Sequence, residues 1–143
     1  MNFLKKDKKF IVAEVGNNHE GNMVNAFKLV DKAKDSGADA VKFQTYKVDK
    51  FLSKNYNKKS IKRLHKFSLS YDEFYKIRNY CKKKKIIFFS TPLDIESAIF
   101  LDKIQNIFKI SSGDNNYYDL IKTIKSFRKP IIISSGLLEG KAL

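Results

Sequence analysis

Short apolar runs alternate along this chain with longer segments of mixed polarity. The apolar runs cover residues 10–16, 40–45, 86–92, 108–114 and 130–136. They begin with consecutive apolar residues, which is typical of strands that are buried on both faces of a parallel sheet. The order of the runs and the segments between them therefore predicts an α/β fold in which helices cover a parallel sheet.

The segment between the first two runs has the period of an amphipathic helix. Ala26, Val30 and Ala33 recur on one face of it, as the residues facing a core do. Asn22 is suited to cap the first turn, because its side-chain oxygen can accept a hydrogen bond from a free backbone N–H group. Gly37 is placed to end the helix.

Three later segments are predicted to be helices by the same reasoning. Ser70 and Glu73 have the spacing of a capping box at the start of the first of them, and Asp94 is placed to cap the second. The predicted core residues of the three helices are Phe74, Ile77 and Cys81; Ala98, Leu101 and Ile104; and Leu120, Ile124 and Phe127.

The stretch from residue 46 to residue 69 is basic and has no clean period. We predict a long loop with a short helix there. The compact repeat of the later strands suits a (β/α) barrel, and a doubly wound open sheet is the alternative. The stretch VGNNHEGN after the first strand lacks the G-x-G-x-x-G fingerprint of a dinucleotide site.

Composition limits the classes of function. The 43% hydrophobic and 13% aromatic content is that of a globular domain. Cys81 is the one cysteine, which excludes an internal disulfide framework. Lysines interrupt the N-terminal region where a signal peptide needs an apolar core, and no apolar run approaches the roughly 20 residues of a membrane span. We expect a cytoplasmic protein without a membrane partner.

The net charge of +14 has two interpretations. It is typical of a protein that binds nucleic acid or an anionic membrane, and also of a lysine-rich composition such as AT-rich coding produces. The basic residues are mostly scattered lysines, with no arginine-rich arm, zinc-ligand spacing or aromatic RNA-binding signature. We therefore expect no nucleic-acid partner.

Polar residues follow the apolar start of each predicted strand. They are Glu14; Lys42, Gln44 and Thr45; Ser90 and Thr91; Lys109, Ser111, Ser112 and Asp114; and Ser134 and Ser135. In parallel α/β folds the carboxyl ends of the strands form the functional site. Because side chains alternate along a strand, Lys42 and Gln44 share a face, as do Lys109 and Ser111.

Two lysines in core strands predict an anion site. Phe43 and Ile110 are expected to face the helices, which turns Lys42 and Lys109 toward the opposite side of the sheet. A buried ammonium without a partner costs several kcal/mol. Glu14 offsets part of the charge, and an anionic ligand between the two amino groups would offset the rest. Nearby hydroxyl groups are suitable donors to phosphate or carboxylate oxygens.

Five blocks of the sequence carry a family resemblance. They are AEVGNNHEGN, GADAVKFQTYK, FFSTP, FKISSGDNNYYDLI and KPIIISSG, and they follow one another over nearly the whole chain. Together they resemble the sialic acid synthase family, which makes nonulosonic acids. The resemblance implies the N-terminal portion, about five βα units, of a TIM (β/α)8 barrel. It also implies condensation of phosphoenolpyruvate with an N-acylated mannosamine-type sugar, releasing phosphate.

The resemblance assigns roles to individual residues. It implies that Lys42 and Lys109 hold the phosphate and carboxylate of phosphoenolpyruvate, and that Glu14 lies near the reacting carbons. The further implied substrate contacts are Thr91, Ser112 and Ser134 with phosphoenolpyruvate, and Gln44 and Asp114 with the sugar. Family members often have glutamate at the position of Asp114, and the basic stretch 46–69 does not match the family pattern well.

The resemblance also implies parts that this chain does not contain. A TIM barrel has eight strands and about 250 residues, so residues 1–143 are expected to be a partial barrel domain. The family uses Mn²⁺ or Mg²⁺ held by two histidines of later strands, so we assign no metal ligand here. His19 is expected to have a structural role and His65 to be solvated. Family members are homodimers with a small C-terminal domain, and this chain alone is expected to be inactive.

Two other functions remain open on the sequence. One is an aldolase that uses Lys42 or Lys109 to form a Schiff base with a carbonyl substrate. The other is a non-catalytic module that binds anions or nucleic acid through the basic stretch and Lys82–Lys85. Those four lysines also fit a solvated helix C-terminus, where cations are favourable.

Overall fold

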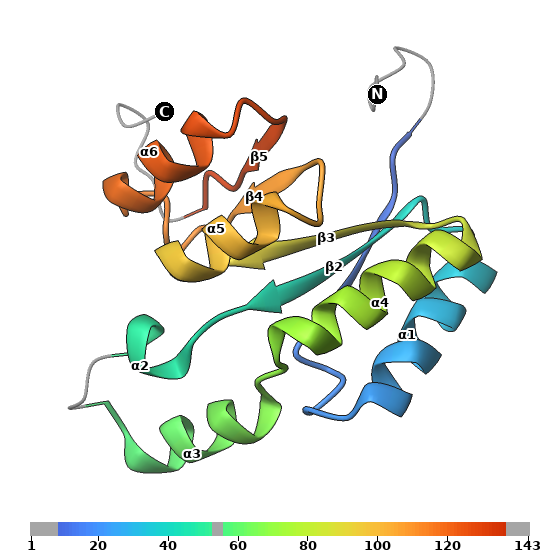
Figure 1. Ribbon diagram of the computed structural model, residues 1–143, viewed down its shortest axis with the longest axis horizontal. Coiled ribbons are helices and arrows are strands. Elements are labelled where there is room, and N and C mark those ends of the chain that lie inside the picture. Colours follow the sequence, from blue (N-terminus) through green and yellow to red (C-terminus); the bar gives the residue numbers. More distant parts are fainter. Residues whose placement is uncertain (1–8, 53–55, 137–143) are drawn as a thin grey trace.

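A computed structural model describes residues 9–52 and 56–136 of the chain (Figure 1). Strands and helices alternate along it as the sequence predicts. The elements are β1 (Val12–Gly16), α1 (Met23–Asp35), β2 (Ala40–Thr45), α2 (Val48–Phe51), α3 (Lys58–Phe67), α4 (Tyr71–Lys84), β3 (Ile87–Pro92), α5 (Ile95–Asp102), β4 (Phe108–Ile110), α6 (Tyr118–Ser126) and β5 (Ile131–Ile133).

All strand pairs of the described residues are parallel, as predicted. β1, β2 and β3 form one ladder in that order, β4 pairs with β5, and β3 contacts β4. In the β1–β2 register Glu14 is opposite Lys42, and in the β2–β3 register Gln44 is opposite Thr91. The polar residues at the strand ends therefore lie at one edge of the sheet, which confirms the α/β class.

Helices cover one face of the sheet. α1 and α4 lie side by side against β1, β2 and β3, and α5 and α6 pack together beside β4 and β5 (Figure 1). Phe43 points into this layer and contacts the rings of Phe74 and Phe88. Ile110 belongs to the same core. Both residues thus face the helices, as the alternation of side chains predicts.

The predicted helix caps are confirmed. Asn22 accepts hydrogen bonds from the N–H groups of the first turn of α1, and Ser70 and Glu73 form the capping box of α4. Asp94 caps α5 and also accepts a hydrogen bond from the backbone N–H of Lys47. The predicted core residues of α1, α4 and α5 are buried, as are Leu120 and Ile124 of α6, while Phe127 is half-buried.

Over residues 46–69, of which 53–55 lie outside the described residues, the prediction of a long loop is wrong, although helical structure was expected within it. Two helices, α2 and α3, occupy most of it. Their inner sides form a small apolar cluster in which Ile61 and Leu64 pack with Tyr46 and Val48. Because these are two separate short helices, no single helical period runs through the stretch. The apolar residues of α3 are also only half-buried, so the sequence did not indicate a core helix there.

The last two strands are shorter than predicted. β4 ends at Ile110 because the next residues form a turn, in which the Asp114 N–H donates to the Ser111 carbonyl oxygen (3.1 Å). The Ser111 hydroxyl donates to the Asp114 carboxylate, and such local hydrogen bonds compete with a sheet ladder.

Among the helices of the described residues, none combines the length and apolar character needed to cross a bilayer.

Candidate functional site

A cleft of about 380 Å³ lies at the carboxyl ends of β1, β2, β4 and β5. Its walls come from strand ends and from the loop that follows β1. The lining residues are Glu14, Val15, Gly16, Asn17, Asn18, Lys42, Gln44, Lys109, Ser111, Ser112 and Ser134. Six of the eight site residues expected from the sequence are therefore neighbours here, and Thr91 and Asp114 lie outside the lining.

Lys42 is held at the base of the cleft by two partners. Its Nζ lies 2.8 Å from Glu14 Oε1 and donates to Thr91 Oγ1 at 2.9 Å. Only 8% of the residue is exposed, whereas 59% of the Glu14 side chain is. Thr91 thus positions the amino group from beneath, and Glu14 is open to the cleft. A lysine that is nearly buried with one carboxylate partner keeps a donor N–H available for a ligand oxygen.

Lys109 lines the same cleft from β4. Its amino group donates to the backbone carbonyl of Ile110. Burial and the neighbouring charge of Lys42 lower the pKa of Lys109, and Glu14 and Asp114 act in the opposite direction more weakly. Lys42 and Lys109 thus line one cleft, and the charge of Lys42 acts on Lys109.

Hydroxyl groups complete the polar wall. Ser112 and Ser134 both line the cleft, and Ser134 N donates to the Ile110 carbonyl oxygen (3.1 Å), which fixes the end of β5 beside β4. Ser111 also lines the cleft, and its hydroxyl is engaged by Asp114. Asp114 therefore orients a wall residue in this structure rather than facing the cleft itself.

Sequence reasoning missed the loop after β1 as a source of site residues. Asn17 and Asn18 line the cleft, and Asn17 Nδ2 donates to Gln44 Oε1 at 2.9 Å. The loop turns back on itself through a positive φ at Gly16 and at Gly21. The sequence does carry a signal for this loop. In the block AEVGNNHEGN, the amides Asn17 and Asn18 follow the carboxylate Glu14 at the end of the first strand.

The two histidines lie where the sequence predicts. His19 is buried against the Phe43 ring, and its Nδ1 accepts a hydrogen bond from Gly21 N (3.1 Å). Burial lowers the pKa of His19, so the ring is neutral at pH 7 and supports the loop. His65 is exposed on α3 and lies 3.7 Å from Asp49.

The cleft offers two ammonium groups, one carboxylate and several hydroxyl and amide groups. This set suits a ligand with more than one anionic oxygen cluster, because ammonium groups and hydroxyls donate to such oxygens. In residues 9–52 and 56–136 no group of three His, Cys, Asp or Glu side chains could hold a metal ion. The donor groups that line the cleft therefore suit an anion.

Comparison with known proteins gives a consistent result. The model of the NeuB family matches residues 29–142. The spore coat polysaccharide biosynthesis protein SpsE of Bacillus subtilis is 36% identical over 137 residues, and the N,N'-diacetyllegionaminic acid synthase of Campylobacter jejuni is 35% identical over 143 residues. The alignments cover 89% and 91% of this chain.

A solved structure has the same fold. The crystal structure of the N-acetylneuraminic acid (sialic acid) synthetase of Leptospira borgpetersenii, in complex with citrate, superposes with a TM-score of 0.88 and 30% identity over 93% of this chain. This chain spans 46% of that protein, 37% of SpsE and 43% of the Campylobacter synthase. It therefore corresponds to less than half the length of each.

Proposed function

Because this chain belongs to the NeuB family, we propose that its cleft binds phosphoenolpyruvate for condensation with an N-acylated amino sugar. The chain would form consecutive βα units of a TIM barrel, with the cleft at the carboxyl ends of its strands. Synthases of nonulosonic acids among its relatives support this reaction class. The product would be a nonulosonic acid and inorganic phosphate.

The proposal depends mainly on the pair of amino groups. Lys42 and Lys109 come from different strands, line the same cleft and act on each other electrostatically. Phosphoenolpyruvate carries a phosphate and a carboxylate, both attached to its C2 atom. It would neutralise both ammonium groups at once, with Ser112 and Ser134 donating to its oxygens.

The chemistry assigned to these residues is electrostatic. C3 of phosphoenolpyruvate forms a bond to the aldehyde carbon of the sugar, and water adds to C2. Phosphate then leaves as its C–O bond breaks. Lys42 and Lys109 would stabilise the charge on the departing phosphate, and such preorganised donors are usually the largest catalytic contribution. Glu14, which lies 2.8 Å from Lys42 Nζ, would stand next to the reacting carbons.

A divalent metal is implied by the family resemblance and would polarise the sugar aldehyde. The described residues offer no set of ligands that fits it. Since these residues do not provide metal ligands, we assign the reaction steps to residues of this chain alone.

Phosphoenolpyruvate binding to Lys42→Met and Lys109→Met variants tests the proposal. Each variant should weaken binding about 10- to 100-fold, which corresponds to the loss of hydrogen bonds to a charged group. Lys28→Met, at an exposed lysine of α1, is the matched control and should stay within about twofold of the native chain. Titration calorimetry gives the dissociation constants. Equal affinities for all four proteins would refute the site.

One observation favours a second function. A lowered pKa, as at Lys109, makes a lysine amine more nucleophilic and suits a Schiff-base aldolase. Borohydride treatment in the presence of pyruvate distinguishes the two, since it traps a covalent adduct only if an imine forms. We expect an unchanged mass of the intact chain. A mass increase located at Lys109 would establish the aldolase instead.

A further inference from the structure

Within the described residues, two separate strand ladders border the cleft. β1, β2 and β3 form the ladder that carries Lys42, and β4 and β5 form the ladder that carries Lys109. β3 and β4 are in contact, but in residues 9–52 and 56–136 no backbone hydrogen bond joins them. The spacing of the two lysines therefore depends on other contacts between the ladders.

The side chain of Gln105 supplies such a contact. Gln105 lies between α5 and β4 and is 3% exposed. Its Oε1 accepts a hydrogen bond from the backbone N–H of Ser90 at 2.7 Å, and its Nε2 donates to the Ser90 carbonyl oxygen at 3.2 Å. Ser90 belongs to β3. One side-chain amide thus binds both backbone groups that a paired strand would bind.

The backbone of Gln105 is fixed to the ladder of Lys109. Its carbonyl oxygen accepts a hydrogen bond from Lys129 Nζ at 2.9 Å, and the same amino group lies 2.7 Å from Asp102 Oδ1. The residue after Lys129 is Pro130, whose carbonyl oxygen accepts from the N–H of Phe108 at 2.9 Å. Gln105 is therefore held at the start of β4 and β5.

Ser90, the partner of Gln105, is fixed to the residues that hold Lys42. The next residue, Thr91, accepts the hydrogen bond from Lys42 Nζ at 2.9 Å. The hydroxyl oxygens of Ser90 and Thr45 lie 2.7 Å apart, which joins β3 to the strand of Lys42. Both Ser90 and Thr91 are buried. A shift of the Ser90 backbone would therefore move Lys42 as well.

Gln105 does more than fill space between the ladders. An apolar side chain of similar size would leave the N–H and carbonyl groups of Ser90 unpaired, and burying such groups without partners is costly. The Gln105 amide can satisfy both in one orientation only, since its nitrogen donates and its oxygen accepts. A buried polar contact with every partner present makes a core rigid and specific.

We propose that Gln105 is a positioning residue that holds β3 beside β4 and so sets the spacing of Lys42 and Lys109 for an anion that contacts both. This inference rests on the proposed function, because the spacing matters to a ligand that needs both amino groups. Gln105 does not line the cleft. It acts through Ser90, and phosphoenolpyruvate would lose one of its two cationic contacts if the ladders moved apart.

The first measurement is the affinity for phosphoenolpyruvate by calorimetry. Gln105→Met removes both hydrogen bonds at nearly constant side-chain length and should weaken binding about tenfold, the scale of one lost hydrogen bond to a charged group. Gln105→Asn keeps the amide on a shorter side chain, so it should give a smaller loss in the same direction. It serves in every measurement below if Gln105→Met does not fold.

Ser97→Ala is the matched control. Ser97 is fully buried in α5, and its hydroxyl donates to Asp94 Oδ2 at 2.7 Å. This variant also loses a buried hydrogen bond, and it should unfold at lower urea concentration than the native chain. It should bind phosphoenolpyruvate within about twofold of native, because its lost bond does not join the two ladders. A tenfold loss here as well would overturn the role of Gln105.

A double-mutant cycle distinguishes spacing from general loosening of the fold. Lys109→Met leaves one of the two amino groups, so the spacing no longer matters. In that background Gln105→Met should change the affinity by no more than about twofold, instead of tenfold. If the two losses simply multiply in the double variant, Gln105 and Lys109 act independently, and the spacing role is overturned.

A measurement without ligand separates this inference from the proposed function. Burial and the charge of Lys42 lower the pKa of Lys109, so moving the ladders apart in Gln105→Met should raise that pKa toward its ordinary value. Carbon-13 NMR of the lysine side chains follows the titration, and the Lys109 signal is the one missing from Lys109→Met. The pKa should not change in Ser97→Ala.

The two kinds of failure then have different signatures. If the native chain does not bind phosphoenolpyruvate, the proposed function fails, and the Lys109 titration alone decides the role of Gln105. An unchanged Lys109 pKa in both Gln105 variants overturns that role. So does native phosphoenolpyruvate affinity in Gln105→Met when the native chain binds this ligand.

Discussion

Lys109 makes the stability of the chain depend on pH. Its pKa in the folded chain is below the ordinary value of 10.5, first because of burial and then because of Lys42. Between these two values the unfolded chain binds more protons, so the free energy of unfolding rises with pH in that window. Below that window the amine is charged in both states, and the full cost of burying it is present.

Lys109→Met should therefore unfold at higher urea concentration than the native chain at pH 7. Its advantage should shrink as the pH approaches 10.5, because the native amine loses its proton and its cost. Urea denaturation at pH 7 and at pH 10 gives the two differences. Lys28→Met should show no such change, and a gap that widens with pH would contradict the assigned cause.

Single residues show what the sequence can and cannot predict about a site. Lys42 and Lys109 were found because a cation in an apolar strand is costly and alternation fixes its direction. The contact of Asp114 with Ser111 was not predicted, because it depends on a turn that ends β4 early. The Asn17–Gln44 bond joins residues 27 positions apart, and no local pattern encodes such a partner.

The loop after β1 packs closely against helix α3 at Gly21. Gly21 has φ +75, and a Cβ there would lie 2.0 Å from the carbonyl oxygen of Lys66. Gly37 has a similar φ of +81 with no atom within 4 Å of such a Cβ. The first site combines backbone strain with a clash against another backbone, whereas the second has the strain alone.

Gly37→Ala should destabilise the chain by about 1 kcal/mol, the cost of a left-handed conformation for alanine. Gly21→Ala should cost more than twice that, because α3 or the loop must move. It should also weaken phosphoenolpyruvate binding, since the same loop contributes to the cleft wall. Urea denaturation and calorimetry measure both effects. Equal stabilities of the two variants would show that the contact with Lys66 is not tight.

The elements differ in how well their sequence predicts them. α1, α4 and α5 carry a cap and a buried stripe, two signals that agree. α3 has a cap, Asn57, and a clear amphipathic period, but no fully buried residue, and its few apolar positions lie in a basic stretch that does not resemble a core helix. Its place depends on tertiary contacts with Tyr46 and Gly21, which no helical pattern specifies.

The hydrophobic pattern of the chain predicts that its strands are parallel, but it does not predict which strands lie at the edges of the sheet. In the part of the chain that is described, β1 pairs only with β2 and β5 only with β4. Ile132 and Ile133 of β5 are 40% and 56% exposed. Strands whose edges and aliphatic side chains are open tend to pair with another segment, which agrees with a chain that spans under half of its relatives.

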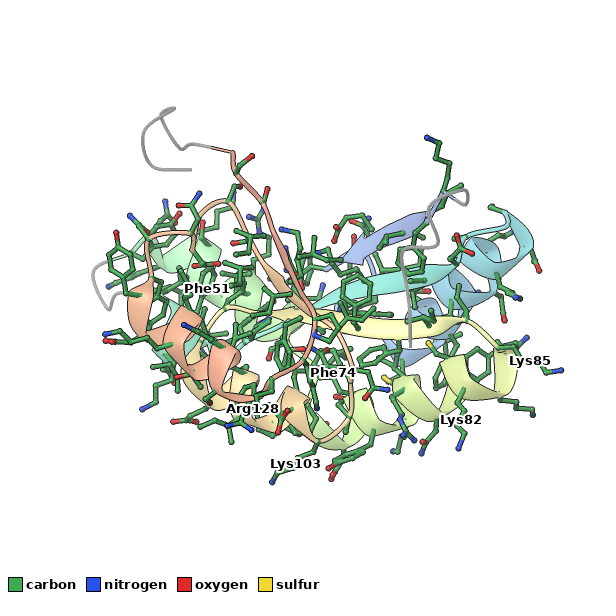
Figure 2. All side chains as sticks on the ribbon, turned by 90° about the horizontal axis from the view of Figure 1, so that it is seen from above. Phe51, Phe74, Lys82, Lys85, Lys103 and Arg128 are labelled. Carbon is green, nitrogen blue, oxygen red and sulfur yellow. The ribbon has the colours of Figure 1, made fainter. Side chains whose placement is uncertain are left out.

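Part of the excess positive charge of the molecule lies on α3, near the cleft. α3 carries exposed cations without an ion pair among the described residues, namely Lys58, Lys59, Lys62, Arg63 and Lys66, and its last turn touches the loop that lines the cleft. Lys82 and Lys85 lie at the opposite end of the strands, far from Phe51 of α2 (Figure 2). A positive rim raises the encounter rate of an anion with the cleft beside it.

Neutralising three cations of α3 should therefore slow the association of phosphoenolpyruvate several-fold at low salt. The variant is Lys62→Gln, Arg63→Gln and Lys66→Gln, and the control changes Lys82, Lys83 and Lys85 to Gln with the same loss of charge. Stopped-flow association rates should fall only in the first, and the difference should vanish as the Debye length shrinks to about 3 Å at 1 M salt. Equal slowing in both variants would mean that net charge, rather than its position on α3, draws the anion to the cleft.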